Sequence, residues 1–483
     1  MRKHCFILIA ALLLSGGLNA KIKLPPVIGD NMVLQQQTDA ALFGKAAPGK
    51  TVTVKTSWDK KKYSTQADSQ TGKWLLRVKT PKAGGPYEIT ISDGDKITLR
   101  DVLIGEVWFA SGQSNMEMPV KGYGSQPAKD GVKYIMAAKQ SRPVRICSIK
   151  KQSSLTVQDS CGGQWFKHTP DAVANCSATA YFFADALQNV LDIPVGIIVS
   201  SWGGSSIETW MKREVFEKDF PDTDLGHLDG TRPVKRNYHD PCMLYNGQVA
   251  PLVPFTFKGI IWYQGEQNRP RPDLYVKQQQ AYAKMMREDF QVPDAPFYLV
   301  QIAPYPYDNG RKTHSAYLCE AQQKAAQSIP HSGYVTTVDI GEYGTIHPCR
   351  KQEVGQRLAM LALNNDYGYE SIEAWAPYYK IVEFHDGKGF VQMKVGKLGL
   401  SPLGADISGF EIAGPDRRFV EAKARRDPKR GDVVVVWSDE VPEPVAVRYC
   451  WRNWCVGGLY NNFGIPAGPF RTDDWPVNAK DWE

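Results

Sequence analysis

The middle of the chain alternates between apolar segments of strand length and helical patterns, and this alternation constrains the possible folds most strongly. Strands are predicted for the apolar segments 102–110, 195–200, 259–263, 297–302 and 333–339. Helices are predicted for 178–187, 207–218, 274–290, 316–328 and 348–363. Because strands that alternate with helices form parallel sheets covered on both faces, residues 101–365 are expected to form an α/β domain with an open, doubly wound sheet.

The two flanking regions have a different character. Residues 21–100 contain short alternating segments such as 51–55 and 87–91, separated by Gly- and Pro-rich turns, and predict a β-sandwich module. Residues 366–483 return to strand patterns at 433–437 and 445–449, with few helix signals. We therefore expect an N-terminal β-sandwich module, a central α/β domain and a C-terminal β-rich module.

The first 20 residues have the pattern of a secretory signal peptide. Arg2 and Lys3 precede an apolar run, and the small residue Ala20 ends the segment. The apolar run is too short to anchor the chain in a bilayer. The sequence therefore predicts a secreted or periplasmic protein with a cleavable signal peptide and no membrane anchor.

Charge and cysteine content exclude several classes of function. The formal net charge of +7 is mild, and the absence of a Lys/Arg block interleaved with aromatic residues argues against a nucleic-acid partner. No Cys or His pairs stand at the spacing of a zinc site, so no metal is expected. In an exported chain Cys450 could pair with Cys455, and Cys147 with Cys161, but sequence alone does not decide the pairing.

Four polar clusters follow strands of the predicted sheet, at 111–115, 201–205, 264–268 and 344–348. In open α/β sheets, ligands bind beyond the carboxyl ends of the strands. The fold prediction therefore gathers these distant clusters along one edge, where they can form a single site.

The residue types in these clusters suit acyl transfer. Ser114 is the candidate nucleophile, and His347 is the candidate base that takes its proton. His347 precedes Pro348, which suits the first position of a helix. The oxyanion of a tetrahedral intermediate needs hydrogen-bond donors. The candidates are the backbone N–H groups and side-chain amides of Ser114, Gly203, Gly204, Gln264 and Asn268.

Two other hydrolase layouts are not supported by the sequence. The chain contains no Gly-x-Ser-x-Gly segment, which would place a serine on the nucleophile elbow of an α/β-hydrolase. It also contains no His-Glu-x-x-His segment of a zinc protease.

Segments 107–116, 201–210 and 259–268, together with Ile346-His347-Pro348 and Lys351-Gln352, resemble the sialate O-acetylesterases of the SGNH/GDSL-like hydrolase superfamily. The resemblance implies an SGNH-type, flavodoxin-like parallel sheet flanked by helices. It implies hydrolysis of O-acetyl esters, most naturally those of sialic acids, through an acyl-enzyme on Ser114 with His347 as base. It implies no metal and no organic cofactor.

One position departs from the SGNH pattern. Many of these enzymes carry an Asp three residues before the catalytic His, and Gly344 occupies that position here. Asp339 is the candidate replacement that would orient His347, and a backbone carbonyl is the alternative. Glu266 is a candidate substrate-binding residue, and it is expected to support the loop of Gln264 and Asn268 rather than to act in catalysis.

A sialic acid would need a cation to pair with its carboxylate. Arg269, Arg271 and Arg311 lie near the predicted edge, and Arg269 is the preferred candidate. Trp202 and Tyr263 could offer apolar faces to a sugar ring, whereas Trp210 is expected in the core.

The sequence is also compatible with two alternative functions. One is an acetyl esterase for other acetylated glycans such as xylan. The other is a non-catalytic carbohydrate-binding protein with a degenerate hydrolase core, which the missing Asp at Gly344 would favour. The oligomeric state is not predicted.

Overall fold

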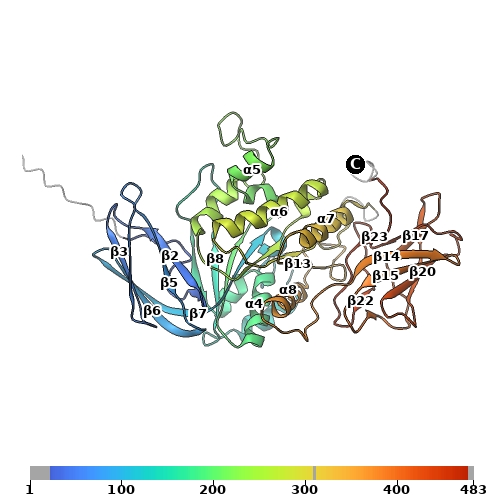
Figure 1. Cartoon of the computed structure of the whole chain (residues 1–483), viewed down its shortest axis with the longest axis horizontal. Helices are drawn as coiled ribbons and strands as arrows, with labels where there is room; N and C mark the ends of the chain where they lie inside the picture. Colours follow the sequence, from blue (N-terminus) through green and yellow to red (C-terminus); the bar gives the residue numbers. More distant parts are fainter. Residues whose placement is uncertain (1–21, 308–311, 477–483) are drawn as a thin grey trace, which may run out of the picture.

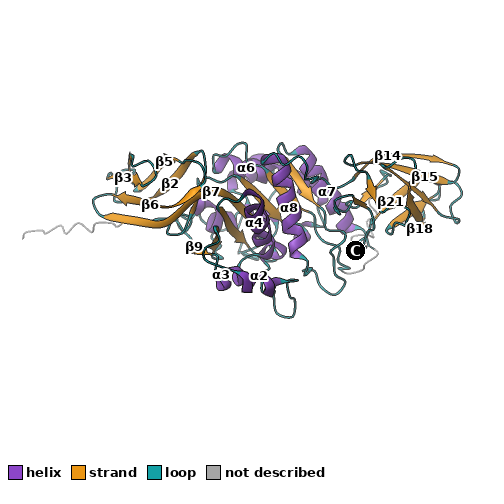
Figure 2. Cartoon of the chain, turned by 90° about the horizontal axis from the view of Figure 1, so that it is seen from below, coloured by secondary structure: helices purple, strands orange, loops and turns teal. Residues whose placement is uncertain are grey.

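The computed structural model describes residues 22–307 and 312–476 of the chain, so the expected signal peptide lies outside the described residues. An N-terminal β-rich part, a central α/β part and a C-terminal β-rich part follow one another along the long axis of the molecule (Figure 1). The central part carries most of the helices (Figure 2).

The central part is built on a mostly parallel sheet. In spatial order its strands are β13 (Ser332–Val335), β12 (Phe297–Val300), β11 (Gly259–Tyr263), β7 (Lys96–Gly112), β10 (Val195–Ser201), β8 (Val144–Ile149) and β9 (Gly163–Lys167). Neighbouring strands are parallel except β9, which is antiparallel to β8. The expected doubly wound α/β sheet is confirmed. The flavodoxin-like strand order is wrong, because β7 lies between β10 and β11 instead of beside β8.

Helices cover both faces of this sheet. On one face, α4 (Ala178–Leu191) and α8 (Lys351–Asp366) pack with alternate residues of the strands, including Ile197 and Ile261. On the other face, α6 (Pro272–Asp289) and α7 (His314–Ser328) pack with the intervening residues. The central strands are buried on both faces, which explains their uninterrupted apolar sequences.

Some central elements differ from the prediction. The expected helix over 207–218 consists of a 3-10 turn, Ile207–Trp210, followed by α5 (Arg213–Asp219). Strand β8 was not predicted because Arg145 interrupts its apolar pattern. Arg145 is nevertheless buried and pairs with Asp101 at 3.2 Å, which makes a charged residue tolerable in a buried strand.

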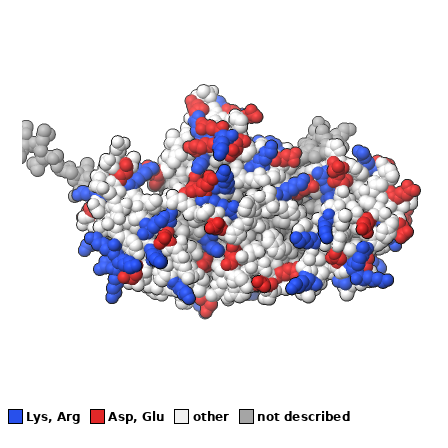
Figure 3. Space-filling model, in the orientation of Figure 1, with Lys and Arg blue, Asp and Glu red and all other residues white. Residues whose placement is uncertain are grey.

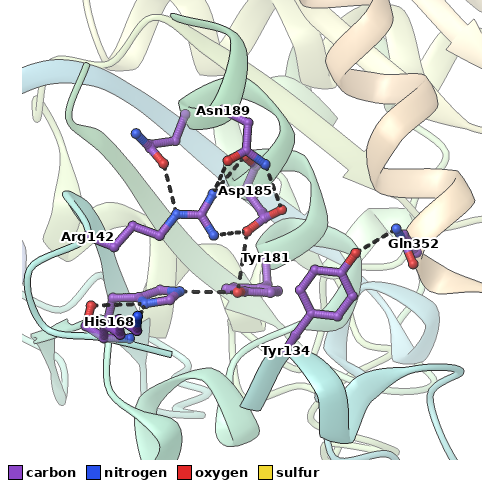
Figure 4. A network of polar contacts seen from close by, with 9 residues as sticks. Tyr134, Arg142, His168, Tyr181, Asp185, Asn189 and Gln352 are labelled. Atoms are coloured by element: carbon purple, nitrogen blue, oxygen red, sulfur yellow. Dashed lines mark hydrogen bonds and ion pairs between the residues drawn. The ribbon is translucent and has the colours of Figure 1, made fainter. Parts of the chain in front are cut away.

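A polar network fastens α4 to its surroundings (Figure 4). Arg142, just before β8, donates to Asp185 and Asn189 of α4. On the same side of the sheet, Gln352 of α8 donates to Tyr134 of α2 (Gly131–Ala137) at 2.7 Å. These contacts tie the segment from α2 to β8 to helices α4 and α8, and α3 (Pro170–Asn175) leads into α4.

The N-terminal part is continuous with the central sheet. Its strands are β1 (Val33–Gln35), β2 (Asp39–Lys45), β3 (Thr51–Thr56), β4 (Lys62–Gln66), β5 (Lys73–Lys79) and β6 (Gly84–Ser92). The long strand β7 pairs with β6 over its first half and with β10 over its second half. Strand β7 therefore passes residue 100, the expected module boundary, without a break.

The C-terminal part contains two four-stranded antiparallel sheets and a short strand pair. Its strands are β14 (Tyr378–His385), β15 (Lys388–Lys394), β16 (Leu400–Ser401), β17 (Phe410–Ala413), β18 (Phe419–Glu421), β19 (Lys423–Arg426), β20 (Val433–Trp437), β21 (Ala446–Tyr449), β22 (Tyr460–Asn461) and β23 (Phe470–Arg471). A separate apolar core that includes Val391, Ile412 and Val447 lies between them. Arg471 of β23 contacts Glu320 of α7 at 3.1 Å and so links this part to the central one.

Positive and negative side chains are interspersed over the face shown in Figure 3. None of the helices in the described ranges has the length and apolarity to cross a membrane. Among the described residues, no three His, Cys, Asp or Glu side chains are grouped so that they could hold a metal ion.

Candidate functional site

Ser114 follows strand β7, and later strands of the central sheet lie on both sides of β7. Strand β7 has parallel neighbours on both sides, and the next segments build outward from it in opposite directions. This is a topological switch point, the usual position of a ligand site in such sheets. Gly112 makes the sharp exit from β7 with φ +142, and a Cβ there would lie 2.1 Å from the Tyr263 carbonyl oxygen. The first turn of α1 (Ser114–Glu117) follows directly.

The structure brings the four polar clusters together around one pocket of about 510 Å³. The lining residues are Gln113, Ser114, Tyr123, Gly203, Gly204, Glu266, Gln267, Arg269, Tyr307, Ile346 and His347. The candidate nucleophile and the candidate base thus face the same cavity, although 233 positions separate them in the sequence.

Gln126 orients the imidazole of His347. The Nδ1–H of His347 donates to Oε1 of Gln126 at 2.8 Å, and the ring packs edge-on against Tyr123 at 5.3 Å between centroids. With the proton on Nδ1, Nε2 keeps a lone pair and has the tautomer of a general base. Burial lowers the pKa of His347 to about 4, with a further lowering by the nearby Lys351 charge and an opposing effect of Glu117.

The prediction that Asp339 orients His347 is wrong. The Asp339 carboxylate accepts two hydrogen bonds from Arg357, at 2.9 and 2.7 Å, and pairs with Arg350. The prediction that Pro348 opens the following helix is also wrong, because α8 begins at Lys351. His347 therefore lies in a loop before the helix, where Gln126 reaches it.

Sequence reasoning missed Gln126 because it lies in a loop without a strand or a catalytic motif. Backbone hydrogen bonds in both directions between Tyr123 and Gln126 close this loop. The N–H of Lys129 then donates to the Cys349 carbonyl at 2.9 Å, which ties the loop to the His347 segment. Only the fold brings these segments side by side.

Three of the predicted oxyanion donors are engaged elsewhere. Gln264 donates from Nε2 to the Ser205 carbonyl at 3.0 Å and to Asn268 Oδ1 at 2.7 Å. Asn268 donates to Glu208 at 2.9 Å, and both amides are fully buried outside the pocket lining. The N–H of Gly203 donates to the Glu117 carboxylate. The predicted oxyanion roles of Gln264, Asn268 and the Gly203 N–H are therefore wrong.

Gln113 is a further candidate for a side-chain amide donor, and it does line the pocket. Its Oε1 accepts a hydrogen bond from the Gly265 N–H at 3.1 Å, so its Nε2 is the end of the amide that can donate to a ligand. Gln113 lines the pocket beside Ser114, and Gly204 lines it with φ +75. The candidate oxyanion donors are thus the N–H groups of Ser114 and Gly204 together with Gln113 Nε2.

A buried polar network lies directly beneath Ser114 and His347. Lys351 Nζ donates to Asn115 Oδ1 at 2.6 Å, and Asn115 Nδ2 donates to Glu266 Oε1 at 2.6 Å and to the Ile346 carbonyl at 3.1 Å. Asn115 and Ile346 are the sequence neighbours of Ser114 and His347, so this network joins the two candidate catalytic segments. Glu266 has a supporting role, as expected, but it holds Asn115 rather than Gln264 or Asn268.

Comparisons with known proteins identify the family of the chain. A family model described as carbohydrate esterase, sialic acid-specific acetylesterase matches residues 104–364. The chain belongs to this family. It is 29% identical to the human sialate O-acetylesterase and 29% identical to the one from Pongo abelii, and each match covers 92% of this chain and 91% of the relative.

A solved structure shows the same relationship in three dimensions. The crystal structure of a carbohydrate acetylesterase from Xanthomonas citri is 35% identical, with a TM-score of 0.82, over 94% of this chain and all of the other. This family member is therefore a carboxylic ester hydrolase that acts on acetyl esters, and its family implies an acetylated sugar as substrate. The alternative of a non-catalytic binding protein is set aside.

Removing Lys351 from this carbohydrate esterase is expected to destabilise the fold. Burial lowers the pKa of Lys351 to about 7 and raises that of Glu266. In Lys351→Met, the buried Asn115 loses its hydrogen bond from Nζ and Glu266 loses a nearby cation, which is expected to lower the free energy of unfolding by roughly 1–3 kcal/mol. Equilibrium urea unfolding measures the change. Lys351→Met combined with Glu266→Gln is expected to recover part of the loss, and an undiminished stability of the single variant would contradict the importance of the pair.

Of the predicted substrate-binding residues Arg269, Tyr263 and Trp202, only Arg269 lines the pocket. Arg269 lines the pocket, and its guanidinium carbon lies 3.3 Å from the ring centroid of Tyr307. Tyr263 is fully buried, so the prediction that it contacts a sugar is wrong. Trp202 stacks on Tyr238 at 6.3 Å outside the pocket lining, so its contact with a sugar stays a prediction.

The remaining aromatic and arginine candidates are also placed. Trp210 is fully buried, which confirms its expected place in the core. Arg271 pairs with Glu208 at 2.8 Å and does not line the pocket. Arg311 lies outside the described residues.

Proposed function

We propose that this esterase removes O-acetyl groups from sialic acids through an acyl-enzyme on Ser114, with His347 as general base. The observation that supports this most is the shared pocket. Ser114 and His347 line it together, and Gln126 holds His347 in the tautomer whose Nε2 can accept a proton.

The reaction follows from these positions. His347 Nε2 takes the proton of the Ser114 hydroxyl while Oγ attacks the acetyl carbonyl carbon. The N–H groups of Ser114 and Gly204 and the amide of Gln113 donate to the oxyanion. The sugar oxygen then leaves with the proton from His347. Water, deprotonated by the same imidazole, attacks the acetyl-enzyme and releases acetate and free Ser114.

His347 is hydrogen-bonded to the neutral amide of Gln126 and not to a carboxylate, which affects the pH at which His347 gains a proton. A buried carboxylate would stabilise the imidazolium, whereas Gln126 does so less, and the pKa of His347 lies near 4. Because the base must be unprotonated, kcat/KM is expected to hold as pH falls from 7 to 5 and to decline only as pH falls through about 4.

Gln126→Glu is expected to raise the pKa of His347, since an anion next to Nδ1 favours the protonated ring. The decline of kcat/KM should then begin at higher pH than in the wild type. Gln126→Leu should instead lose the orientation and lower kcat/KM roughly 100-fold at all pH values. Superimposable pH profiles of the wild type and Gln126→Glu would contradict the role of Gln126.

Arg269 is the candidate partner of the sialic acid carboxylate. It lines the pocket that holds Ser114, and Tyr307 packs against the flat face of its guanidinium. A guanidinium is planar and its N–H groups match a carboxylate with two parallel hydrogen bonds, which suits this residue type to the substrate. Acetylated xylan lacks such a carboxylate on its acetylated xylose units, so it is the competing substrate class against which the proposal is tested.

Arg269→Met is expected to raise KM for O-acetylated sialic acid about 10- to 100-fold, because a charge-assisted contact is lost. KM for a neutral acetyl ester should change less than threefold. Acetate release from both substrates measures the difference, and Arg271→Met is the matched control outside the pocket. Equal losses on the two substrates, or a strong preference of the wild type for acetylated xylan, would reject the sialate assignment while leaving the esterase activity in place.

We also propose that the chain is exported. Residues 1–20 have the charged start, apolar run and small final residue of a signal peptide. The mass of the exported protein tests this directly. A mature chain that begins at Lys21 supports export, and retention of Arg2 and Lys3 in the exported form contradicts cleavage.

A further inference from the structure

The loop over 451–454 connects the C-terminal part with the walls of the pocket. It carries two tryptophans and an asparagine and is bounded by Cys450 and Cys455. Both cysteines are free thiols in the structure, and their sulfur atoms lie 2.7 Å apart. The loop lies between the C-terminal β-rich part and α7, which are neighbours in both views (Figures 1 and 2).

The surroundings are shaped for a sulfur–sulfur bond. Gly409 has φ +97 and lies close to both thiols. A Cβ at this position would lie 2.8 Å from Cys450 Sγ and 3.3 Å from Cys455 Sγ, so only glycine leaves room for the two sulfur atoms. The Gly409 carbonyl accepts a hydrogen bond from the Cys450 N–H at 2.8 Å, which fixes the start of the loop. A covalent bond requires the sulfurs to approach by only about another 0.7 Å.

Asn453 of this loop is hydrogen-bonded to two segments of the central part, one at Tyr305 and one at Ser315. Its carbonyl accepts from the Tyr305 N–H at 2.9 Å. Its side-chain Oδ1 accepts from the N–H and the hydroxyl of Ser315 at 3.1 and 2.8 Å. Tyr305 packs edge-on against Tyr307, and Tyr307 stacks on Arg269 in the pocket wall. Asn453 therefore supports the residues that hold Arg269.

The two tryptophans of the loop make contacts on either side. Trp451 packs on Tyr317 of α7 at 5.1 Å between ring centroids. Trp454 packs edge-on against Tyr343 at 5.3 Å, and Tyr343 lies four residues before His347. The loop thus contacts the segment of the candidate base as well as the segment of Tyr307.

We propose that Cys450 and Cys455 form a disulfide in the exported protein, and that this bond holds the 451–454 loop in the conformation that positions the Tyr307–Arg269 wall of the pocket. The second part rests on the proposed role of Arg269, whereas the first part does not. Cys450 and Cys455 are positioning residues, because neither lines the pocket.

The bond forms by exchange with a low-molecular-weight or protein disulfide, which is the oxidant. The Cys455 thiolate attacks one sulfur of that disulfide and releases the first thiolate. The Cys450 thiolate, having lost its proton to solvent, then attacks Cys455 Sγ and releases the second. Two protein thiols are oxidised, and one disulfide is reduced to two thiols. The hydrogen bond from Cys450 and the nearby Arg452 cation lower the pKa of Cys455, whereas burial raises that of Cys450, which suits Cys455 as the first nucleophile.

Mass spectrometry of the full-length mature enzyme tests the bond. The protein is incubated with oxidised glutathione, unfolded and alkylated with iodoacetamide before digestion. The expected product is a peptide with Cys450 and Cys455 linked and two hydrogens lighter than the reduced form, while buried Cys319 is alkylated. Alkylation of both Cys450 and Cys455 after this treatment would overturn the proposal.

The same oxidised and reduced samples test the positioning role without a change of sequence. Mild reduction is expected to raise KM for the acetylated sugar about 3- to 10-fold with little change in kcat, and reoxidation should restore it. Cys450→Ser combined with Cys455→Ser should be insensitive to reductant and should keep the higher KM. A KM that is identical in the oxidised and reduced enzyme would overturn the positioning role while leaving the disulfide in place.

Discussion

Ser114→Ala is expected to lower kcat/KM for a chromogenic acetyl ester by roughly 10⁴- to 10⁶-fold, because no other group in the pocket is placed to form the acyl-enzyme in its stead. The fold should be preserved, since Ser114 faces the pocket and its replacement leaves the buried Asn115–Glu266 contact intact. Initial rates over a range of ester concentrations measure the loss, with circular dichroism as the check on folding.

Ser111→Ala is the matched control for this variant. Ser111 lies near the end of β7, three residues before Ser114, is fully buried and does not line the pocket. Its activity should remain within a few-fold of the wild type. Ser114→Ala with activity comparable to Ser111→Ala would rule out Ser114 as the nucleophile.

His347→Ala is expected to have the second largest effect, a loss of roughly 10³- to 10⁵-fold in kcat/KM. Without the imidazole, the Ser114 hydroxyl loses the base that is proposed to accept its proton. The cavity left by the ring suggests a sharper measurement, because added imidazole can enter it. Addition of imidazole should restore a measurable part of the activity.

The control for the His347 variant is a hydrogen-bonded histidine outside the pocket lining. His168 is buried and hydrogen-bonds to Tyr181 at 3.1 Å, far in sequence from the pocket residues. His168→Ala is expected to lose stability but to gain no activity from added imidazole. Wild-type-like activity of His347→Ala would exclude His347 as the base.

The sequence predicted those features that depend on local pattern. The parallel sheet followed from uninterrupted apolar strands such as Val195–Ser201, because burial on both faces requires apolar residues at every position. The shared edge of the four polar clusters followed from the rule that parallel strands end on the same side. Strand β8 was not predicted, because Arg145 interrupts its apolar sequence. The charge of Arg145 is balanced by Asp101, which is distant in the sequence.

The features that depend on contacts between distant segments were not predictable in this way. Gln126 and His347 are 221 residues apart, and nothing in either segment indicates the other. The amides of Gln264 and Asn268 have the right chemistry for an oxyanion, but their hydrogen-bonding capacity is used within the buried core. Gln113 is the candidate for that role, because the Gly265 N–H fixes its oxygen and its Nε2 is the end that can donate. Which of several equivalent amides faces a pocket is decided by packing and not by residue type.

Covalent labelling tests most directly whether Ser114 is the nucleophile. A fluorophosphonate reacts with serine hydroxyls that a neighbouring base activates. Incubation of the full-length mature enzyme with this reagent should abolish esterase activity in proportion to labelling. Peptide mass spectrometry should locate a single phosphonyl group on Ser114, and His347→Ala should label much more slowly. Complete inactivation with the label on another residue, or full activity of an enzyme labelled on Ser114, would contradict the account.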